Sequence, residues 1–373
     1  MSQRSKIVIG VGDLLGCGYY RCAMPYKHLS KLGFEVILTN KLNVELNPQD
    51  VLVLQRQHHE GILALAKDFK ARGGKLVFEL DDYFHELPPN NPARASYPRG
   101  GQALKAMESF MELSDLLTVS TPPLGDNYKK WASNVHVCYN VIDPSDFKNV
   151  PKEPRVDGTI RLGWAGSATH LDDLQQVIKP VTEILKEFPQ TRFVFVGQNY
   201  SNLFPLEMRK RIHYTGHTFP IHNGKALFYD AEGGNPVVKY YELLDKSDID
   251  IAIAPLLNVA FNRSKSYIKL IEYGMSNIPF VASDYGPYSQ FIRSTKNNVG
   301  YLADSNSNWK RNLKTLIADE QLRKTVAKNN YDNVIENHSI TLGVNQWINA
   351  LSSIGVYPDG EPGSYTENIV KMH

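Results

Sequence analysis

The sequence predicts an α/β protein made of two Rossmann-like, doubly wound domains that face each other across a cleft. The chain has 373 residues, which is more than one hydrophobic core usually organises. Short apolar runs alternate with amphipathic helical segments in both halves, and this is the pattern of parallel βαβ units. A polar, proline-rich stretch near residue 150 separates the halves, as domain linkers do.

The first half of the chain alternates strands with helices. Residues 6–13, KIVIGVGD, form an apolar run typical of a buried parallel strand, and Gly16 and Gly18 permit a tight loop after it. The glycine spacing does not match the dinucleotide fingerprint, so we expect no dinucleotide site there. Further strands are predicted at 34–39, 51–55, 75–82, 116–121 and 135–140, with helices at 24–33, 61–74 and 102–114.

The second half repeats this pattern with different residues. An apolar strand at 160–166 leads into a helix over 167–188, in which apolar residues recur at helical spacing. We expect the polar tail after Pro358 to be mobile. Further strands are predicted at 192–197, 212–216, 249–256 and 278–284, and helical segments near 264–276 and over 308–353. The domains are thus expected at 1–150 and 151–338, followed by a C-terminal helix and tail at 339–373.

Composition limits the classes of protein that the chain can belong to. Lys and Arg number 41 against 39 Asp and Glu, which excludes a histone-like polycation but leaves room for a local basic cleft. The three cysteines have no metal-ligand spacing and favour a reducing compartment. The sequence begins directly with a strand and holds no apolar run of membrane-spanning length, so we expect a soluble, cytoplasmic protein.

Strand ends in the second half carry the candidate ligand-binding residues. In an open parallel sheet, ligands bind at the carboxyl ends of the strands. The turn WAGSATH is the most informative, because Gly166 lets backbone approach a ligand and the following helix presents free N–H groups to phosphate. Other strand ends place Asp284 and the loop up to Ser264 at the same edge.

Lys269 and Glu272 lie three residues apart on a predicted amphipathic helix at this edge. An exposed ion pair on an ordinary helix is the simplest interpretation of the two residues alone. Arg263 and Lys265 lie just before this helix and add positive charge near the WAGSATH turn. Together these residues favour an anionic, phosphate-bearing ligand.

Several blocks of the sequence resemble a known family. They are LGWAGSATHLDDL, IDIAIAPLLNVAFNRSKSYIKLIEYG with IPFVASDYGPY, and KLVFELDDYFHELPPNNP in the first half. These blocks resemble the nucleotide-sugar-dependent glycosyltransferases of the GT-B fold, in particular the retaining group called family 4. The resemblance implies that the second domain holds a nucleotide sugar, expected to be a UDP-sugar, and that the first holds the acceptor. It also implies that the last helix crosses back to the first domain.

The resemblance assigns roles to residues of the second domain. Glu272 matches the second glutamate of the family's paired-glutamate signature, which binds the donor ribose. Lys269 and Arg263 fall where cations meet the diphosphate, and Ser167 falls at the start of the phosphate-facing helix. Gly166 and Lys265 belong to the same donor side.

One position departs from the family pattern. The first glutamate of the signature, which faces the transferred sugar, should lie eight positions before Glu272, where this sequence has Ser264. The identity of the sugar therefore stays open. Asn262 or Asp284 could take over the task of that glutamate.

Cations and a helix N-terminus would stabilise the charge that develops on the leaving phosphate, and this chemistry requires neither a metal nor another cofactor. His170, just after the WAGSAT turn, is a candidate catalytic residue, although capping or packing also explains it. Asp82, in the pair Asp81–Asp82, could orient the acceptor, bind a metal or cap a turn. His58 and His59 could accept a proton from the acceptor hydroxyl or be polar surface residues.

The acceptor is the least determined part of the prediction. Gly16, Gly18, Tyr19 and Arg21 are expected to line the acceptor side. Cations and aromatic residues of the first domain could hold an extruded DNA base, as in phage DNA-modifying glycosyltransferases, which would place the chain in a host cytoplasm. A glycan is an equally open acceptor. The sequence thus predicts a hexosyl- or pentosyltransferase, with a catalytically inactive nucleotide-sugar, glycan or DNA-binding module as the alternative.

Overall fold

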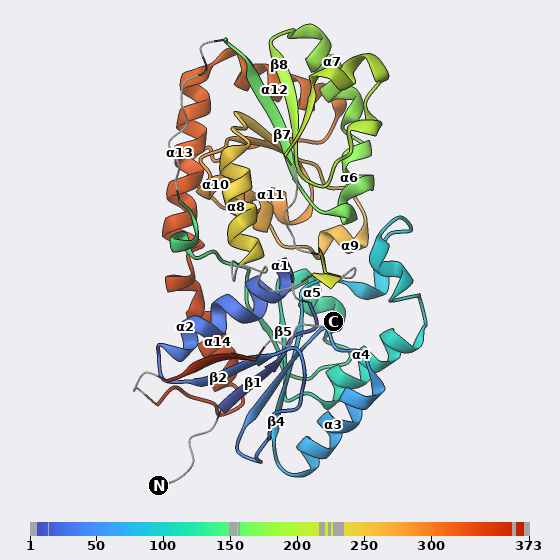
Figure 1. Ribbon diagram of the computed structural model, residues 1–373, viewed down its shortest axis with the longest axis vertical. Coiled ribbons are helices and arrows are strands. Elements are labelled where there is room, and N and C mark those ends of the chain that lie inside the picture. Colours follow the sequence, from blue (N-terminus) through green and yellow to red (C-terminus); the bar gives the residue numbers. More distant parts are fainter. Residues whose placement is uncertain are drawn as a thin grey trace.

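A computed structural model describes residues 6–13, 15–148, 155, 157–215, 221–222, 225–226, 235–359 and 363–368. Figure 1 shows two α/β lobes stacked along the long axis of the molecule. Each lobe contains one parallel sheet with helices packed on it. The predicted fold class of two doubly wound domains is therefore confirmed, whereas the expected boundary between residues 150 and 151 lies outside the described residues.

The N-terminal lobe contains a seven-stranded parallel sheet in the order β15-β2-β1-β3-β4-β5-β6. Its central strands, β1, β3, β4 and β5, are largely apolar and buried, as expected where both faces of a parallel sheet are covered. The strands are β1 (Lys6–Gly10), β2 (Glu35–Thr39), β3 (Val51–Gln55), β4 (Lys75–Leu80), β5 (Leu116–Val119), β6 (Val135–Val137) and β15 (Tyr365–Asn368). The helices are α1 (Gly16–Gly18), a π-helix (Tyr19–Ala23), α2 (Met24–Ser30), α3 (Glu60–Ala71), α4 (Gln102–Leu113) and α5 (Pro122–Tyr128).

The C-terminal lobe contains a six-stranded parallel sheet in the order β14-β13-β12-β7-β8-β9. The strands are β7 (Ile160–Gly166), β8 (Thr191–Gly197), β9 (Ile212–Thr215), β12 (Ile251–Ala254), β13 (Phe280–Ser283) and β14 (Tyr301–Ala303), and a separate hairpin pairs β10 (Ile221–His222) with β11 (Lys225–Ala226). The helices are α6 (Leu171–Gln175), α7 (Ile178–Glu187), α8 (Pro236–Lys246), α9 (Ala260–Arg263), α10 (Ile268–Met275), α11 (Gly286–Arg293), α12 (Asn306–Ala318) and α13 (Glu320–Asn337).

Two predictions for this lobe are wrong in detail. The single helix expected over 167–188 is a 3-10 turn followed by the separate helices α6 and α7. Strand β14 was not predicted, because three residues are too short to show a periodicity.

The chain returns to the N-terminal lobe at its end. Ile142 and Ser339 form a parallel bridge, and α14 (Ile340–Ser352) then packs against α2. Strand β15 extends the sheet at the open edge of β2, where the Val36 N–H donates to the Ser364 carbonyl at 2.8 Å. The expectation of a mobile tail is wrong for residues 363–368, because an edge strand offers unpaired backbone groups to any chain that reaches it.

The lobes share buried apolar contacts. One core cluster includes Tyr20 and Met24 of the N-terminal lobe, Tyr241 and Leu270 of the C-terminal lobe, and Trp347 of α14. The rings of Phe147 and Tyr241 stack with centroids 4.0 Å apart. This packing holds the carboxyl ends of the two sheets face to face. None of the helices in the described ranges is long and apolar enough to cross a membrane.

Candidate functional site

Lys269 lies at the carboxyl end of β7, as the sequence predicted for a ligand edge. Its ammonium donates to the Ala165 carbonyl and lies 5.2 Å from the centre of the Trp164 ring. A Cβ atom on Gly166 would come within 3.0 Å of the Lys269 Nζ atom. Gly166 therefore leaves the space that the lysine needs beside the strand end.

The environment of Lys269 weakens its positive charge. Its side chain is buried, and it forms no ion pair with any residue that the structure describes. Burial lowers the pKa of Lys269 to about 8, although the Glu272 carboxylate opposes this shift. The interpretation as an exposed surface pair is therefore wrong, and the lysine resembles the perturbed groups that are common at functional sites.

Glu272 lies one turn further along α10 and is also buried. Its Oε1 atom accepts a hydrogen bond from the Tyr20 hydroxyl at 2.6 Å, and its Oε2 atom accepts one from the Tyr240 hydroxyl at 3.2 Å. Burial raises the pKa of Glu272, while Lys269 and the two phenols oppose that shift. Tyr20 belongs to the N-terminal lobe, so both lobes contact this carboxylate.

Asp173 joins three segments of the donor side, although the sequence analysis did not single it out. Its Oδ2 atom lies 2.8 Å from His170 Nδ1, and its Oδ1 atom accepts from the Leu257 N–H and the Asn262 side-chain amide, both at 2.8 Å. Burial lowers the pKa of His170, so a neutral imidazole is favoured. An acidic pair in the first turn of α6, LDDLQ, was the available signal, but Leu257 and Asn262 are distant from it in sequence.

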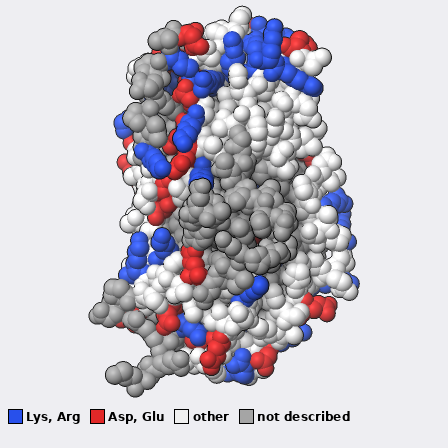
Figure 2. Space-filling model, viewed as in Figure 1, with Lys and Arg blue, Asp and Glu red and all other residues white. Residues whose placement is uncertain are grey.

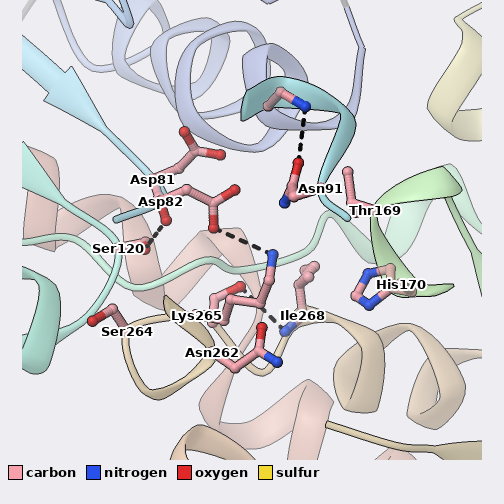
Figure 3. A network of polar contacts seen from close by, with 12 residues as sticks. Asp81, Asp82, Asn91, Ser120, Thr169, His170, Asn262, Ser264, Lys265 and Ile268 are labelled. Carbon is pink, nitrogen blue, oxygen red and sulfur yellow. Dashed lines mark hydrogen bonds and ion pairs between the residues drawn. The ribbon is translucent and has the colours of Figure 1, made fainter. Parts of the chain in front are cut away.

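Residues 264–266 form an interdomain contact segment, in which each residue contacts the N-terminal lobe. The Ser264 carbonyl accepts from the Thr121 hydroxyl at 2.7 Å. The Lys265 ammonium lies 3.3 Å from Asp82 Oδ1 and crosses the cleft, as Figure 3 shows. The Ser266 hydroxyl accepts from the Asn140 side chain at 2.9 Å. The structure thus brings together Asp82 and Lys265, two of the predicted site residues.

Asn262 and Asp284, the substitutes expected for the missing glutamate, are each bonded to other side chains of their own lobe. The Ser264 hydroxyl accepts from the Asn127 amide at 2.9 Å and is buried between the lobes. Asn262 bonds to Asp173, whereas Asp284 contacts Ser289 Oγ at 2.5 Å and Arg293 at 2.7 Å on its own lobe. Asp284 is therefore engaged by α11, and the expectation that it could replace the glutamate finds no support in its contacts.

Arg263 and Ser167 are exposed at the edge of the donor side. The Arg263 Nε–H donates to the Tyr285 hydroxyl at 3.1 Å, and Ser167 Oγ lies 3.0 Å from Thr169 Oγ1. Both side chains retain exposed polar atoms that a phosphate could contact.

The structure does not place Arg21 on an acceptor surface. Its guanidinium is fully buried, with Nε 2.7 Å from Glu79 Oε1. Tyr19 is buried as well and donates to Asp146. A Cβ on Gly18 would lie 1.9 Å from the Asp13 carbonyl, so that glycine serves backbone packing, whereas Gly16 has no such close neighbour. The prediction that this loop presents Tyr19 and Arg21 to an acceptor is wrong, because both side chains are buried.

His58 and His59 stack on one another with ring centroids 4.3 Å apart. His58 Nδ1 lies 3.3 Å from the Tyr97 hydroxyl, and burial lowers the pKa of His58. His59 is exposed and stands immediately before α3. Tyr97 also lines a cavity between the lobes, so His58 lies one residue away from that cavity wall.

A cavity of about 260 Å³ lies between the lobes. Its N-terminal wall is aromatic and proline-rich, and the rings of Phe84 and Tyr97 lie 4.7 Å apart. Asp172 and Ala260 belong to the opposite wall from the C-terminal lobe. The charged residues around it are Glu86, Arg94, Arg99 and Asp172, and Arg99 pairs with Glu86 at 2.6 Å.

The chain matches no protein-family model and no curated protein sequence. Its structure is similar to solved structures of low sequence identity. A glycosyltransferase from Rickettsia africae superposes with a TM-score of 0.62 and 11% identity, covering 95% of this chain and 100% of that one. Anabaena HepE, solved with UDP and glucose, gives a TM-score of 0.63 and 13% identity over 94% of this chain and 100% of that one.

The fold is that of the GT-B glycosyltransferases. TarM from S. aureus, solved with UDP among its ligands, shares it with a TM-score of 0.55 and 14% identity. The alignment covers 82% of this chain but only 55% of TarM. In this chain, α10 of the C-terminal lobe carries Lys269 and Glu272. From the N-terminal lobe, Tyr20 contacts Glu272 and Asp82 contacts Lys265. No group of His, Cys, Asp or Glu in the described part of the chain is arranged to hold a metal ion.

Proposed function

We propose that this protein transfers a sugar from a nucleotide-diphosphate donor, a UDP-sugar, to an acceptor hydroxyl. The observation that carries the proposal is the buried pair on α10, in which Lys269 reaches the strand end at Gly166 and Glu272 follows one turn later. A cation beside a glycine turn suits a diphosphate, and a carboxylate suits the two hydroxyls of a ribose. The UDP complexes of HepE and TarM agree with this donor class.

The chemistry follows from the charges at the strand ends. When the bond between sugar and phosphate breaks, negative charge grows on the leaving phosphate. Lys269 and Arg263 stabilise that charge, and the contact between the lobes excludes water and strengthens the interaction. The proposed mechanism uses these side chains and requires no metal or other cofactor. Retention of the anomeric configuration is part of the proposal because the sequence resembles retaining enzymes.

The cavity between the lobes is the proposed acceptor site. Its volume of about 260 Å³ is below the roughly 300–1,000 Å³ of pockets that enclose drug-sized ligands, so one hydroxyl-bearing ring fits it. Two arginines and two carboxylates surround it, which suits the hydroxyls of a neutral sugar. Apart from a basic cluster at the far end of the C-terminal lobe, the face drawn in Figure 2 mixes both signs of charge. We propose a glycan acceptor rather than DNA, because the charges that line the cavity are of both signs and DNA needs a basic track.

Nucleotide release from a panel of nucleotide sugars tests the proposed function. We expect UDP release from at least one UDP-sugar, strongly reduced in the variant Lys269→Met. A chain that binds nucleotide sugars but never hydrolyses or transfers one would support the inactive binding module instead. Salt-sensitive binding of duplex DNA in a gel-shift titration would contradict the glycan acceptor.

A further inference from the structure

Tyr20 of the N-terminal lobe contacts the proposed ribose-binding carboxylate. Its hydroxyl lies 2.6 Å from Glu272 Oε1, across a sequence separation of 252 residues. Tyr20 belongs to the π-helix Tyr19–Ala23, a rare element that often occurs at functional sites. Both residues are buried, with exposed fractions of 6% for Tyr20 and 7% for Glu272. A donor site built by the C-terminal lobe alone does not require this contact.

Tyr20 and Tyr240 use only part of the hydrogen-bond acceptor capacity of the Glu272 carboxylate. A carboxylate has about four acceptor positions, two on each oxygen. Tyr20 uses one position on Oε1 and Tyr240 uses one on Oε2. Among the residues that the structure describes, no further donor takes the second position on either oxygen, and these two positions match the two hydroxyls of a ribose. Burial and the Glu272 charge raise the pKa of Tyr20, so its phenol stays a hydrogen-bond donor at neutral pH.

The orientation of Tyr20 is itself fixed by packing. Its hydroxyl also contacts the Tyr241 hydroxyl, and the Tyr241 ring stacks on Phe147 at 4.0 Å. Tyr19, the preceding residue, instead contacts Asp146. Two adjacent tyrosines on one short helix therefore each donate to a different carboxylate, and only Tyr20 reaches the donor side.

We propose that Tyr20 is a positioning residue of the nucleoside site, which makes that site a product of both lobes. By donating to Oε1, Tyr20 orients the Glu272 carboxylate so that its remaining positions meet the ribose hydroxyls. This inference rests on the proposed function, because it takes Glu272 as the ribose ligand. Nucleoside recognition then depends on the contact between the lobes.

Calorimetric titrations with UDP and with 2′-deoxy-UDP test this role. The wild-type chain is expected to bind UDP about tenfold more tightly than 2′-deoxy-UDP, the scale of one hydrogen bond to a charged group. Tyr20→Phe is expected to weaken UDP about tenfold and 2′-deoxy-UDP much less, so that the preference largely disappears. Tyr19→Phe, the matched control, is expected to keep the wild-type preference.

The outcomes separate this inference from the proposed function. A wild-type chain that does not bind UDP would refute the proposed function. A wild-type chain that binds UDP, with an unchanged preference in Tyr20→Phe, would refute only the role of Tyr20. The proposed role would also be overturned if Tyr20→Phe lowered the affinities for UDP and 2′-deoxy-UDP equally, because that result indicates a general structural role. Tighter binding of UDP by Tyr20→Phe would overturn it as well, because it indicates that Tyr20 competes with the ribose. If Tyr20→Phe does not fold, Tyr241→Phe, which removes the other hydroxyl partner of Tyr20, must reduce the preference.

Discussion

Two buried charged sites in this chain are organised in opposite ways. In the N-terminal lobe, Arg21 and Glu79 neutralise each other through Nε–Oε1 at 2.7 Å and Nη2–Oε2 at 3.2 Å. The Arg21 Nη1 atom donates to Asn140, and the guanidinium lies over the Trp347 ring at 5.3 Å. These contacts neutralise both charges inside the N-terminal lobe, so the pair serves the fold.

On α10, by contrast, the charges of Lys269 and Glu272 do not form an ion pair with each other. The lysine donates to a backbone carbonyl and the glutamate accepts from two phenols. Burial lowers the pKa of Lys269 and raises the pKa of Glu272, so it favours the neutral form of each group. Lys269 and Glu272 therefore keep capacity for a ligand, whereas Arg21 and Glu79 satisfy each other and act as a structural element.

The largest effect should come from breaking the Arg21–Glu79 pair. Arg21→Met leaves the Glu79 carboxylate buried without its partner, so the free energy of unfolding should fall by about 3–5 kcal/mol. Urea unfolding followed by circular dichroism measures this change. Lys269→Met should cost far less stability, because no carboxylate loses an ion-pair partner. Equal losses in the two variants would remove the distinction between the sites.

Removing Lys269 should have the second-largest effect, on the rate. Lys269→Met should lower kcat by about 10²–10³-fold, which is the usual effect of removing one group that stabilises charge in the transition state. The KM for the donor should change less. Steady-state assays of nucleotide release measure both constants. Lys310→Met, which breaks a surface pair with Glu183, is the matched control and should leave them unchanged. An unaltered kcat in Lys269→Met would exclude the lysine from leaving-group stabilisation.

The rate should also depend on pH through this lysine. With a pKa of about 8 in the free chain, Lys269 loses its proton as pH rises through 8, and kcat/KM for the donor, which reports the free enzyme, should fall about tenfold per pH unit above that value. The free energy of unfolding should change with pH in the opposite direction to the rate. Between about 8 and 10.5 the unfolded chain binds a proton that the folded chain has lost, so this group raises stability with increasing pH. A kcat/KM for the donor that stays constant up to pH 10 would contradict the role of Lys269 in stabilising the leaving phosphate.

The smallest effect is expected at the cavity. Arg94 forms no ion pair with any described residue, whereas Arg99 is paired with Glu86. Arg94→Gln should therefore raise the KM for a glycan acceptor by a few-fold, about the value of one hydrogen bond, and Arg99→Gln by less. Acceptor titrations at saturating donor compare them. The same change in both variants would mean that the pairing of Arg99 does not matter to the acceptor.

Local patterns in the sequence were sufficient to predict the two sheets and the helix that carries Lys269 and Glu272. Continuous apolar runs and helical spacing are local properties of the sequence, and the structure has strands and helices where they occur. Strand β15 could not be predicted, because the polar residues 365–368 become a strand only where β2 leaves an open edge. The Arg21–Glu79 pair, the contacts of Asp173 with Leu257 and Asn262, and the contact of Tyr20 with Glu272 join distant positions, and no local pattern encodes them.

The role proposed for Glu272 is to bind the ribose of a nucleotide diphosphate. The most direct test is a calorimetric titration of UDP into the wild-type chain and into Glu272→Gln. Because hydrogen bonds to a charged group contribute about 1.5–3 kcal/mol, the variant should bind UDP at least about tenfold more weakly, while pyrophosphate binds both chains alike. Equal UDP affinity in the two chains would contradict the account.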